Sequence, residues 1–437
     1  MAYWDNGALR VSDNRKYLRN GGTPFFWMGD TAWLLMQQCD REEAFLYLKN
    51  RKDKGFNVIQ ATLVHSLPGE NMSSLARISK DVTAKEYWDH CVEIVGMAQD
   101  LGLYMALLPT WGSIVKSGIF REEDTVRYAE FLNARFSGFP NIIWILGGDI
   151  RGSVNIPLYD RFGNALKERM PDKLAGFHPF GRTSSSLWFH DREWLDFNMF
   201  QSGHRRYDQP SLNRWDDGTE EFYGEDNWKY VIRDHSYGIM KPTLDGEPSY
   251  EQIPQGLHDP REPYWQAEDV RRYAYWSVFQ GAMGHTYGDN AIMQFYSGRS
   301  GEGNYGVRER WDISLHHEGS SHMKHLADLI KSVDYENGVP ADGLLLSGQK
   351  EKYDRVAVFA GKDFLLAYDY TGHPFEVSIA GLECERKYAY WHDPVSGVYS
   401  FFGDVTRLES VIAEPPKKRS GQNDWTLVVK SGSSEIK

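Results

Sequence analysis

Cysteine is scarce in this chain of 437 residues, which contains only Cys39, Cys91 and Cys384. Their spacing matches neither a disulfide framework nor a zinc knuckle, so we predict neither. No apolar run approaches the length of about 18 residues that a membrane-spanning helix needs, and we expect no membrane span. Acidic residues outnumber basic ones, 61 to 49, and the resulting net charge of −12 argues against a nucleic-acid partner.

The first residues lack the basic segment and apolar core of a secretory signal peptide. We therefore expect either a cytoplasmic protein or a secreted or periplasmic one whose signal has been removed. Internal repeats, a Walker motif and a dinucleotide fingerprint are also missing from the sequence. The serine run at residues 184–186 lacks the Gly-x-Ser-x-Gly pattern of serine hydrolases. We predict no cofactor, and the sequence leaves the oligomeric state open.

A histidine-rich stretch covers residues 316–325. Within it, His322 and His325 could share one face of a helix. No metalloprotease signature accompanies them. We interpret this stretch as the polar start of a helix and predict no metal site.

The chain is longer than one ordinary domain and suits a barrel of about 250 residues or more followed by a smaller module. Aromatic residues make up 14% of it, with 15 Trp and 25 Tyr. Such a content is typical of a large core, and equally of a sugar cleft in which aromatic rings stack on the C–H faces of sugars. Composition alone does not separate these two interpretations.

Apolar runs alternate with amphipathic segments and glycines along the first three quarters of the chain. This alternation is typical of parallel βα units and predicts an α/β fold, a (β/α)8 barrel over residues 1–337. We predict its strands at residues 25–30, 57–64, 103–109, 141–150, 174–178, 195–201, 241–246 and 281–287. A capping box at Asp40 and Glu43 predicts the start of a helix that ends near residue 54.

Two longer segments, residues 181–194 and 204–222, are rich in charge, Trp and Tyr, and we expect them to form the walls of a cleft. From residue 338 to 437 the pattern changes to short β-rich segments between turns. This pattern predicts a β-sandwich domain. We expect it to pack against the barrel.

Two predicted strands end in glycine followed by a carboxylate, Asp149 after the fourth strand and Glu247 after the seventh. Active sites of barrels lie at the carboxyl ends of their strands, so the two acids could face each other across one pocket. Cleavage of a glycosidic bond needs such a pair. The structural alternative is that each acid caps a helix or pairs with an arginine such as Arg151, and spacing alone leaves both interpretations open.

Polar and aromatic residues recur at the other strand ends, whereas the strands behind them are apolar. A sugar site needs hydrogen-bonding groups and a stacking surface, and these residues could supply both, although any one of them could be an ordinary rim residue. The candidate substrate-binding residues are Asp30, Trp33, Gln60, Trp111, His178, Gln201, His204, His285 and Tyr287.

Four motifs in the barrel region are FFWMGDTAW at residues 25–33, GFNVIQ at 55–60, NIIWILGGD at 141–149 and DGEP at 245–248. Together they resemble the apiosidase-like barrel domain of glycoside hydrolase family 140. The motifs YWHDPVSG at 390–397 and NDWTLV at 423–428 resemble the β domain, named for collagen binding, that usually follows it. The two resemblances cover nearly the whole chain.

The resemblance implies a retaining glycosidase with Asp149 as acid/base and Glu247 as nucleophile, acting on pectic oligosaccharides or polysaccharides and on apiose in particular. The related barrel enzymes usually carry Asn-Glu where this chain has Gly148-Asp149, so the shorter Asp must reach further. We expect a carboxyl separation of about 5–5.5 Å, as retention requires. Alternatives are a non-catalytic carbohydrate-binding protein, an adhesion protein acting through the β domain, and a metal-dependent hydrolase.

Overall fold

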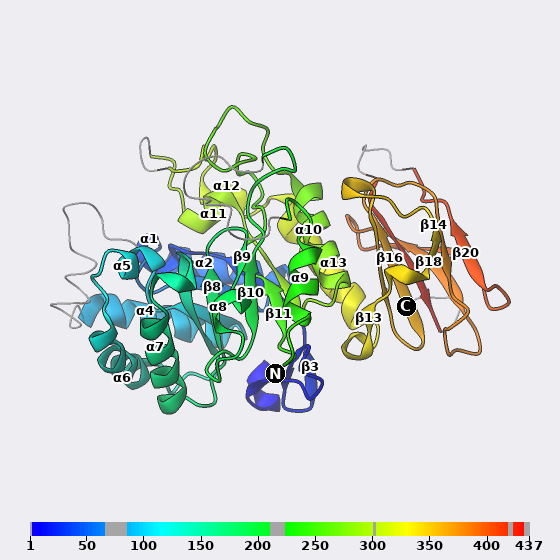
Figure 1. The fold of residues 1–437 in the computed structure, drawn as a ribbon. Helices are drawn as coiled ribbons and strands as arrows, with labels where there is room; N and C mark the ends of the chain where they lie inside the picture. Colours follow the sequence, from blue (N-terminus) through cyan, green and yellow to red (C-terminus); the bar gives the residue numbers. More distant parts are fainter. Residues whose placement is uncertain (1, 66–84, 210–222, 300–302, 418–422, 432–437) are drawn as a thin grey trace.

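The computed structural model describes residues 2–65, 85–209, 223–299, 303–417 and 423–431. A small N-terminal sheet, a barrel and a C-terminal β domain follow one another along the chain (Figure 1). The N-terminal sheet is antiparallel and contains β1 (Leu9–Val11), β2 (Leu18–Asn20) and β3 (Thr23–Phe25).

Eight parallel strands form the barrel, close to the predicted positions. In the order in which they pair, they are β8 (Ala175–Pro179), β7 (Ile142–Ile150), β6 (Tyr104–Leu108), β5 (Val58–Thr62), β4 (Trp27–Thr31), β12 (Gly284–Tyr287), β11 (Thr243–Asp245) and β10 (Asn198–Gln201). The short β9 (Thr183–Ser184) pairs antiparallel with β10. Between β8 and β10 the ring is joined by the amide of Asp196, which donates to the carbonyl of Ala175 at 2.9 Å.

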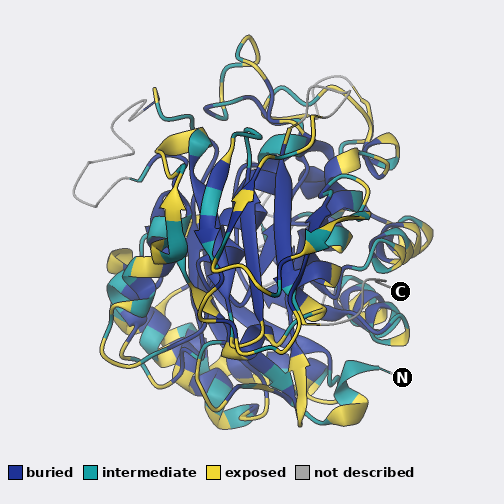
Figure 2. Cartoon of the chain, turned by 90° about the vertical axis from the view of Figure 1, so that its right-hand side faces the viewer, coloured by how far each residue is buried: buried dark blue, intermediate teal, exposed yellow. Residues whose placement is uncertain are grey.

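Helices surround these strands, and of the eight strands' residues only Asp149 is exposed. Figure 2 shows buried residues in the centre of the molecule and exposed ones on its peripheral helices and loops. The longer helices are α2 (Arg41–Asp53), α4 (Lys85–Asp100), α6 (Thr125–Phe136), α7 (Ile156–Arg169), α9 (Trp228–His235), α10 (Ala267–Phe279) and α13 (Glu318–Lys331). Short helices lie in the connections: α1 (Leu35–Gln38), α5 (Gly112–Lys116), α8 (Ser186–Phe189), α11 (Asn290–Gln294) and α12 (Trp311–Ser314).

The start of α2 follows from its sequence. At α2, the Asp40 carboxylate accepts from the amides of Glu42 and Glu43, and the Glu43 carboxylate accepts from the Asp40 amide, which confirms the predicted capping box. Among the described residues, no helix is long and apolar enough to cross a membrane.

Two antiparallel sheets form the C-terminal domain. The larger one contains β13 (Val339–Pro340), β15 (Val356–Ala360), β16 (Phe364–Asp369), β21 (Trp425–Lys430), β18 (Tyr388–His392) and β19 (Tyr399–Asp404), in that order. The smaller one contains β14 (Leu345–Ser347), β17 (Phe375–Ser378) and β20 (Ser410–Ala413). Apolar side chains of both sheets share one core. A (β/α)8 barrel followed by a β-rich domain is thus confirmed.

The C-terminal domain packs against the barrel through α10, which faces it in Figure 1. Two consecutive arginines of this helix are buried there. The Arg271 guanidinium donates to both oxygens of Asp424, at 2.8 and 3.0 Å. One turn further along the helix, Tyr275 stacks on Tyr368 with ring centroids 4.3 Å apart. Charge pairing and apolar packing therefore join the two domains in one interface.

Replacing Asp424 with Asn should lower the free energy of unfolding by about 3–5 kcal/mol, because it leaves the buried Arg271 charge uncompensated. Urea-induced unfolding followed by circular dichroism measures the change. The control is Asp328→Asn, which breaks an exposed pair with Lys324 and should cost no more than about 0.5 kcal/mol. Equal losses in both variants would contradict the importance of the buried pair.

Candidate active site

The end of β7 carries a bulge that directs Asp149 inward. Gly147, Gly148 and Asp149 have positive φ angles of 91°, 101° and 47°, and the pairing register with β8 shifts after Gly147. A Cβ on Gly147 would lie 2.3 Å from the carbonyl oxygen of His178, and one on Gly148 would lie 2.6 Å from the Trp111 ring. Both positions therefore need glycine. Asp149 itself is held in a conformation that costs a non-glycine residue of order 1–3 kcal/mol.

Glu247 follows β11 and is buried, with an imidazole against each oxygen. His204 Nε2 donates to Oε1 at 3.1 Å, and the Tyr250 amide donates to His204 Nδ1, which places the imidazole proton on Nε2. His178 has the same arrangement: its Nδ1 faces the Asp149 amide at 3.5 Å, and its Nε2 lies 3.1 Å from Glu247 Oε2. Two histidines therefore fix the orientation of this carboxylate.

The two acids lie side by side. One carboxylate oxygen of Asp149 lies within 4.8 Å of one of Glu247, and a nitrogen of His178 lies within 4.8 Å of both. Asp149 is exposed to the pocket but lies deep in the protein, and this burial, together with the Glu247 charge, raises its pKa to about 7. Burial also raises the pKa of Glu247, but the contacts with His178 and His204 outweigh it and hold the pKa below its ordinary value. The surroundings of the two acids thus differ: Asp149 keeps its proton up to a higher pH, whereas Glu247 is ionised.

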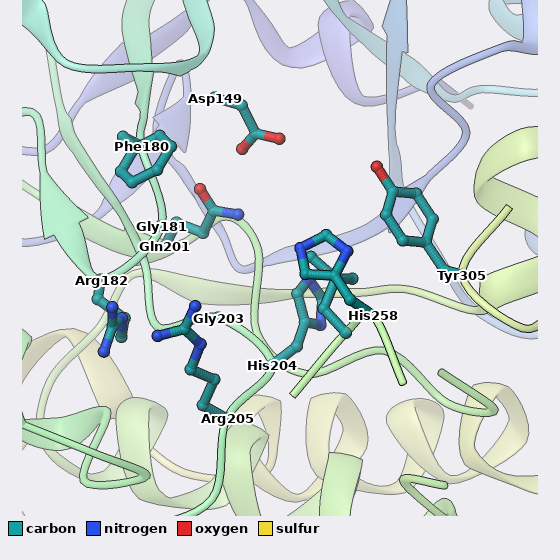
Figure 3. A pocket seen from close by; sticks show the side chains of 11 residues that line it. Asp149, Phe180, Gly181, Arg182, Gln201, Gly203, His204, Arg205, His258 and Tyr305 are labelled. Atoms are coloured by element: carbon teal, nitrogen blue, oxygen red, sulfur yellow. The ribbon is translucent and has the colours of Figure 1, made fainter. Parts of the chain in front are cut away.

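Asp149 lines a pocket of about 380 Å³ (Figure 3). Its described lining consists of Asp149, Phe180, Gly181, Arg182, Gln201, Gly203, His204, Arg205, Leu257, His258 and Tyr305. In Figure 3 the Gln201 amide and the Tyr305 hydroxyl point toward the space below the Asp149 carboxylate. The volume and the mixture of ring faces and polar groups suit a small sugar.

Aromatic rings pack against the His178 side chain. The Trp33 ring packs edge-on against the rings of His178 and Trp111, and its centroid lies 5.1 Å from the centroid of each. The ring centroids of Trp111 and His65 lie 4.6 Å apart. Burial lowers the pKa of His65 to about 4. This aromatic layer restricts the His178 ring to the orientation that contacts Glu247.

Several predicted site residues are therefore brought together. Asp149, Gln201 and His204 line the pocket, and Glu247 and His178 lie directly beside them. Trp33 and Trp111 are close to the site but act through His178.

Asp30 and Tyr287 lie elsewhere, which corrects their predicted place in the pocket. The Asp30 carboxylate is fully buried and accepts from Arg51 Nε at 2.6 Å and from the Tyr47 hydroxyl at 2.5 Å. The Tyr287 hydroxyl donates to Glu251 at 2.6 Å, and its ring lies 6.0 Å from the Arg51 guanidinium. Both side chains thus face helix α2, on the outer side of the strands.

Gln60 and His285 are likewise outside the pocket lining. Gln60 donates to the carbonyl of Gly246 at 2.9 Å, so it supports the backbone just before Glu247. His285 is fully buried, and burial lowers its pKa to about 3. Neither of its ring nitrogens has a hydrogen-bond partner within the described parts of the chain. Gln60 therefore lies in the barrel interior below the site. His285 lies on the same face of β12 as Tyr287, because side chains two residues apart on a strand point to the same side, so it faces away from the pocket.

Sequence reasoning did not identify Arg182, Arg205, His258 and Tyr305. All four come from the connections between strands, where no periodicity singles out one residue. The predicted cleft-wall segments do contain Arg182 and Arg205, so composition indicated the region and not the residue. Residues 210–222 of the second segment lie outside the described residues.

A cation is the remaining chemical possibility, because Asp149, His178 and Glu247 each offer one ligand atom there. A histidine ligand must present a free nitrogen lone pair. His178 Nδ1 accepts from the Asp149 backbone amide, so the neutral imidazole carries its proton on Nε2, which lies 3.1 Å from Glu247 Oε2 and has no hydrogen-bond partner among the described residues. The arrangement therefore suits proton transfer better than metal binding.

Comparison with protein families gives two matches. Residues 12–337 match the family described as "Apiosidase-like, catalytic domain". Residues 339–430 match the family described as "Putative collagen-binding domain of a collagenase". No protein with a curated description matches the chain.

Solved structures give full-length matches. One described as a glycoside hydrolase is 40% identical, with a TM-score of 0.93 over 100% of this chain and 99% of the other. A glycoside hydrolase family 5 protein from Bacteroides vulgatus is 38% identical, with a TM-score of 0.91 over 98% and 95%. A family 5 mannosidase from Rhizomucor miehei shares only the fold, at 10% identity and a TM-score of 0.51 over 75% and 100%. This chain therefore belongs to the apiosidase-like catalytic domain family and is a glycoside hydrolase.

Proposed function

We propose that this enzyme is a retaining glycosidase of the family 140 type, with Asp149 as the general acid/base and Glu247 as the nucleophile. The observation that carries the proposal is the distance between their carboxylate oxygens, within 4.8 Å. Retaining enzymes hold their two carboxyl groups about 5–5.5 Å apart, whereas inverting enzymes need about 6.5–9.5 Å to admit a water molecule. Oxygens within 4.8 Å of each other therefore favour the retaining mechanism over the inverting one.

In the first step, a Glu247 oxygen attacks the anomeric carbon and the glycosidic C–O bond breaks. The Asp149 carboxyl donates its proton to the departing oxygen. In the second step, the Asp149 carboxylate takes a proton from water, the water oxygen attacks the anomeric carbon, and Glu247 is released. Retention follows because the anomeric carbon is attacked twice from opposite sides.

The exchange of roles by Asp149 has an electrostatic cause. The pKa of Asp149 is raised by burial and by the negative charge of Glu247. When Glu247 forms an ester with the sugar, that charge disappears and the second contribution is lost. The pKa of Asp149 then falls, and the residue becomes a carboxylate that can act as a base.

The proposed substrate is a pectic oligosaccharide or polysaccharide, cleaved at apiose. The apiose assignment rests on the description of the matching family. The acidic character of the substrate is supported by the pocket, where Arg182 and Arg205 lie on the same wall (Figure 3). Burial and the neighbouring Arg205 charge lower the pKa of Arg182 to about 10. Guanidinium groups bind planar carboxylates well, so a uronic acid unit is favoured beside them.

A carbohydrate-binding protein without catalysis is the alternative that the sequence left open. It would need the pocket, but neither the close carboxylates nor the different environments of the two acids. Both features are present, and the full-length match to glycoside hydrolases at 38–40% identity agrees with catalysis.

Substitutions of the two acids should have different effects. Glu247→Gln should lower kcat roughly 10³-fold or more on every substrate, because the nucleophile is lost. Asp149→Asn should lower it about 10²–10⁴-fold on natural glycosides, but much less on an activated aryl glycoside, whose leaving group needs no proton. Product release followed by chromatography measures both effects. Glu130→Gln, at an exposed residue of α6, is the matched control and should keep full activity. Turnover by Glu247→Gln would refute the mechanism.

Activity should fall as the pH rises through neutrality. The first step needs protonated Asp149, so kcat/KM on a natural glycoside should fall as the pH rises through about 7. On the acidic side Glu247 stays ionised well below its ordinary range, because its pKa is lowered. A pH–rate profile tests this, and Asp149→Asn should lose the alkaline limb. A limb that persists in that variant would assign it to another group.

Arg205 should contribute to the recognition of acidic sugars. Arg205→Gln should raise KM for a uronate-containing oligosaccharide about tenfold, because a charge-assisted hydrogen bond is lost. A neutral substrate should be affected little. The comparison uses initial rates on oligosaccharides with free and methyl-esterified carboxyl groups. Arg161→Gln, at an exposed residue of α7, serves as the control. Equal changes on both substrates would argue against a uronate subsite.

A further inference from the structure

A buried carboxylate, Glu225, joins three parts of the molecule. Its Oε1 accepts from the Tyr353 hydroxyl at 2.6 Å and from the Tyr207 amide at 3.1 Å, and its Oε2 accepts from Arg272 Nη2 at 2.5 Å. Tyr353 lies in the C-terminal domain, in the 3₁₀ helix η6 (Lys352–Asp354), whereas Arg272 lies on α10 of the barrel. Glu225 itself is fully buried. A donor from each domain therefore reaches the same carboxylate.

Tyr207 belongs to the segment that forms one wall of the active site. Three residues earlier, His204 donates to Glu247, and Arg205 between them lines the pocket. The Tyr207 hydroxyl donates to Asp226 at 2.5 Å, which gives the segment a second anchor beside Glu225. The position of the Tyr207 backbone thus limits where His204 can lie.

A second connection runs from Glu225 to the other side of Glu247. The Asn227 amide donates to the backbone carbonyl of Glu225 at 2.8 Å. The Asn227 side chain donates to Asp245 Oδ2 at 2.9 Å, two residues before Glu247. Glu225 is therefore placed to influence both His204 and the strand end that carries Glu247.

Ring contacts hold Tyr353 in place in addition to its hydrogen bond. The Arg272 guanidinium lies 4.8 Å from the Tyr353 ring and 4.9 Å from the Tyr370 ring, both in the C-terminal domain. The Tyr353 ring also meets the Tyr207 ring edge-on at 5.4 Å. These contacts hold the hydroxyl of Tyr353 where Glu225 needs a donor.

We propose that the C-terminal domain is a positioning element of the active site. Tyr353 holds Glu225, Glu225 holds the Tyr207 amide, and residues 204–207 thereby hold His204 on Glu247. The effect on turnover rests on the proposed role of Glu247 as nucleophile; the effect on the position of the segment does not. Tyr353 is a positioning residue, because it touches neither the pocket nor the acids.

The effect of removing the Tyr353 hydroxyl follows from the burial of the Glu225 carboxylate. Removing its hydroxyl leaves Oε1 of a fully buried carboxylate with the Tyr207 amide as its one remaining donor among the described residues, while Arg272 still binds Oε2. An underbonded buried carboxylate moves toward its remaining cation, here Arg272. The Tyr207 amide would then lose its acceptor, and the segment that ends at His204 would lose an anchor.

The test compares two hydroxyl deletions at the same interface. Tyr353→Phe removes the donor to Glu225, whereas Tyr370→Phe removes a hydroxyl that donates to Asp269 at 3.3 Å. Both variants keep a ring against Arg272 and lose one hydroxyl, so they differ in which carboxylate loses a donor, Glu225 or Asp269. We expect Tyr353→Phe to lower kcat about tenfold with little change in KM, since misplacing a group by a fraction of an ångström has effects of this order. Tyr370→Phe should stay within about twofold of the wild type.

Hydrogen exchange detected by mass spectrometry provides a readout that does not depend on catalysis. In Tyr353→Phe, amides of residues 203–209 should exchange several-fold faster than in the wild type, whereas in Tyr370→Phe they should not. Wild-type kcat and unchanged exchange in Tyr353→Phe would overturn the proposal, and so would equal effects in both variants. If the wild-type enzyme cleaves no glycoside, the proposed function fails, and the exchange data alone then decide whether Tyr353 positions the segment.

Discussion

The mutual charge of two carboxylates in a buried site is the interaction on which this structure depends. Asp149 and Glu247 lie too close together for both to be ionised at little cost. His178 and His204 resolve the conflict because each places its Nε2 3.1 Å from an oxygen of Glu247, so that this residue takes the negative charge. Asp149 then retains its proton to a higher pH. In the proposed mechanism this asymmetry assigns the nucleophile and the acid before any substrate binds.

The backbone at the end of β7 makes that pairing possible with a short side chain. An aspartate side chain is one methylene shorter than that of a glutamate. The bulge at Gly147 and Gly148 shifts the chain inward and brings the Asp149 carboxylate to within 4.8 Å of an oxygen of Glu247. The cost is the strained backbone of Asp149 and the loss of any side chain at two positions.

The barrel and the C-terminal domain share a core, and α10 is the element that joins them. Its neighbouring arginines, Arg271 and Arg272, differ in what they reach. Arg271 pairs with Asp424 of the C-terminal domain, and Arg272 binds Glu225 of the barrel while lying against tyrosines of that domain. The family match names the C-terminal domain for collagen binding. Its contacts with the barrel support the role proposed above, which is to hold a wall of the active site in place.

The sequence by itself determined the order of strands and helices, because hydrophobic period, capping residues and glycines are local signals. It also identified Asp149 and Glu247, each of which follows glycine at the end of an apolar run. It could not distinguish Asp149 from Asp30, which also follows a glycine near a strand end. Side chains alternate between the two faces of a strand, so a shift of one residue reverses the direction in which a side chain points. Only the tertiary structure decided that Asp30 faces Arg51 and that the bulge turns Asp149 into the pocket. It alone also brought Arg182, Arg205 and Tyr305 together from separate connections, because their proximity depends on how the whole ring of strands closes.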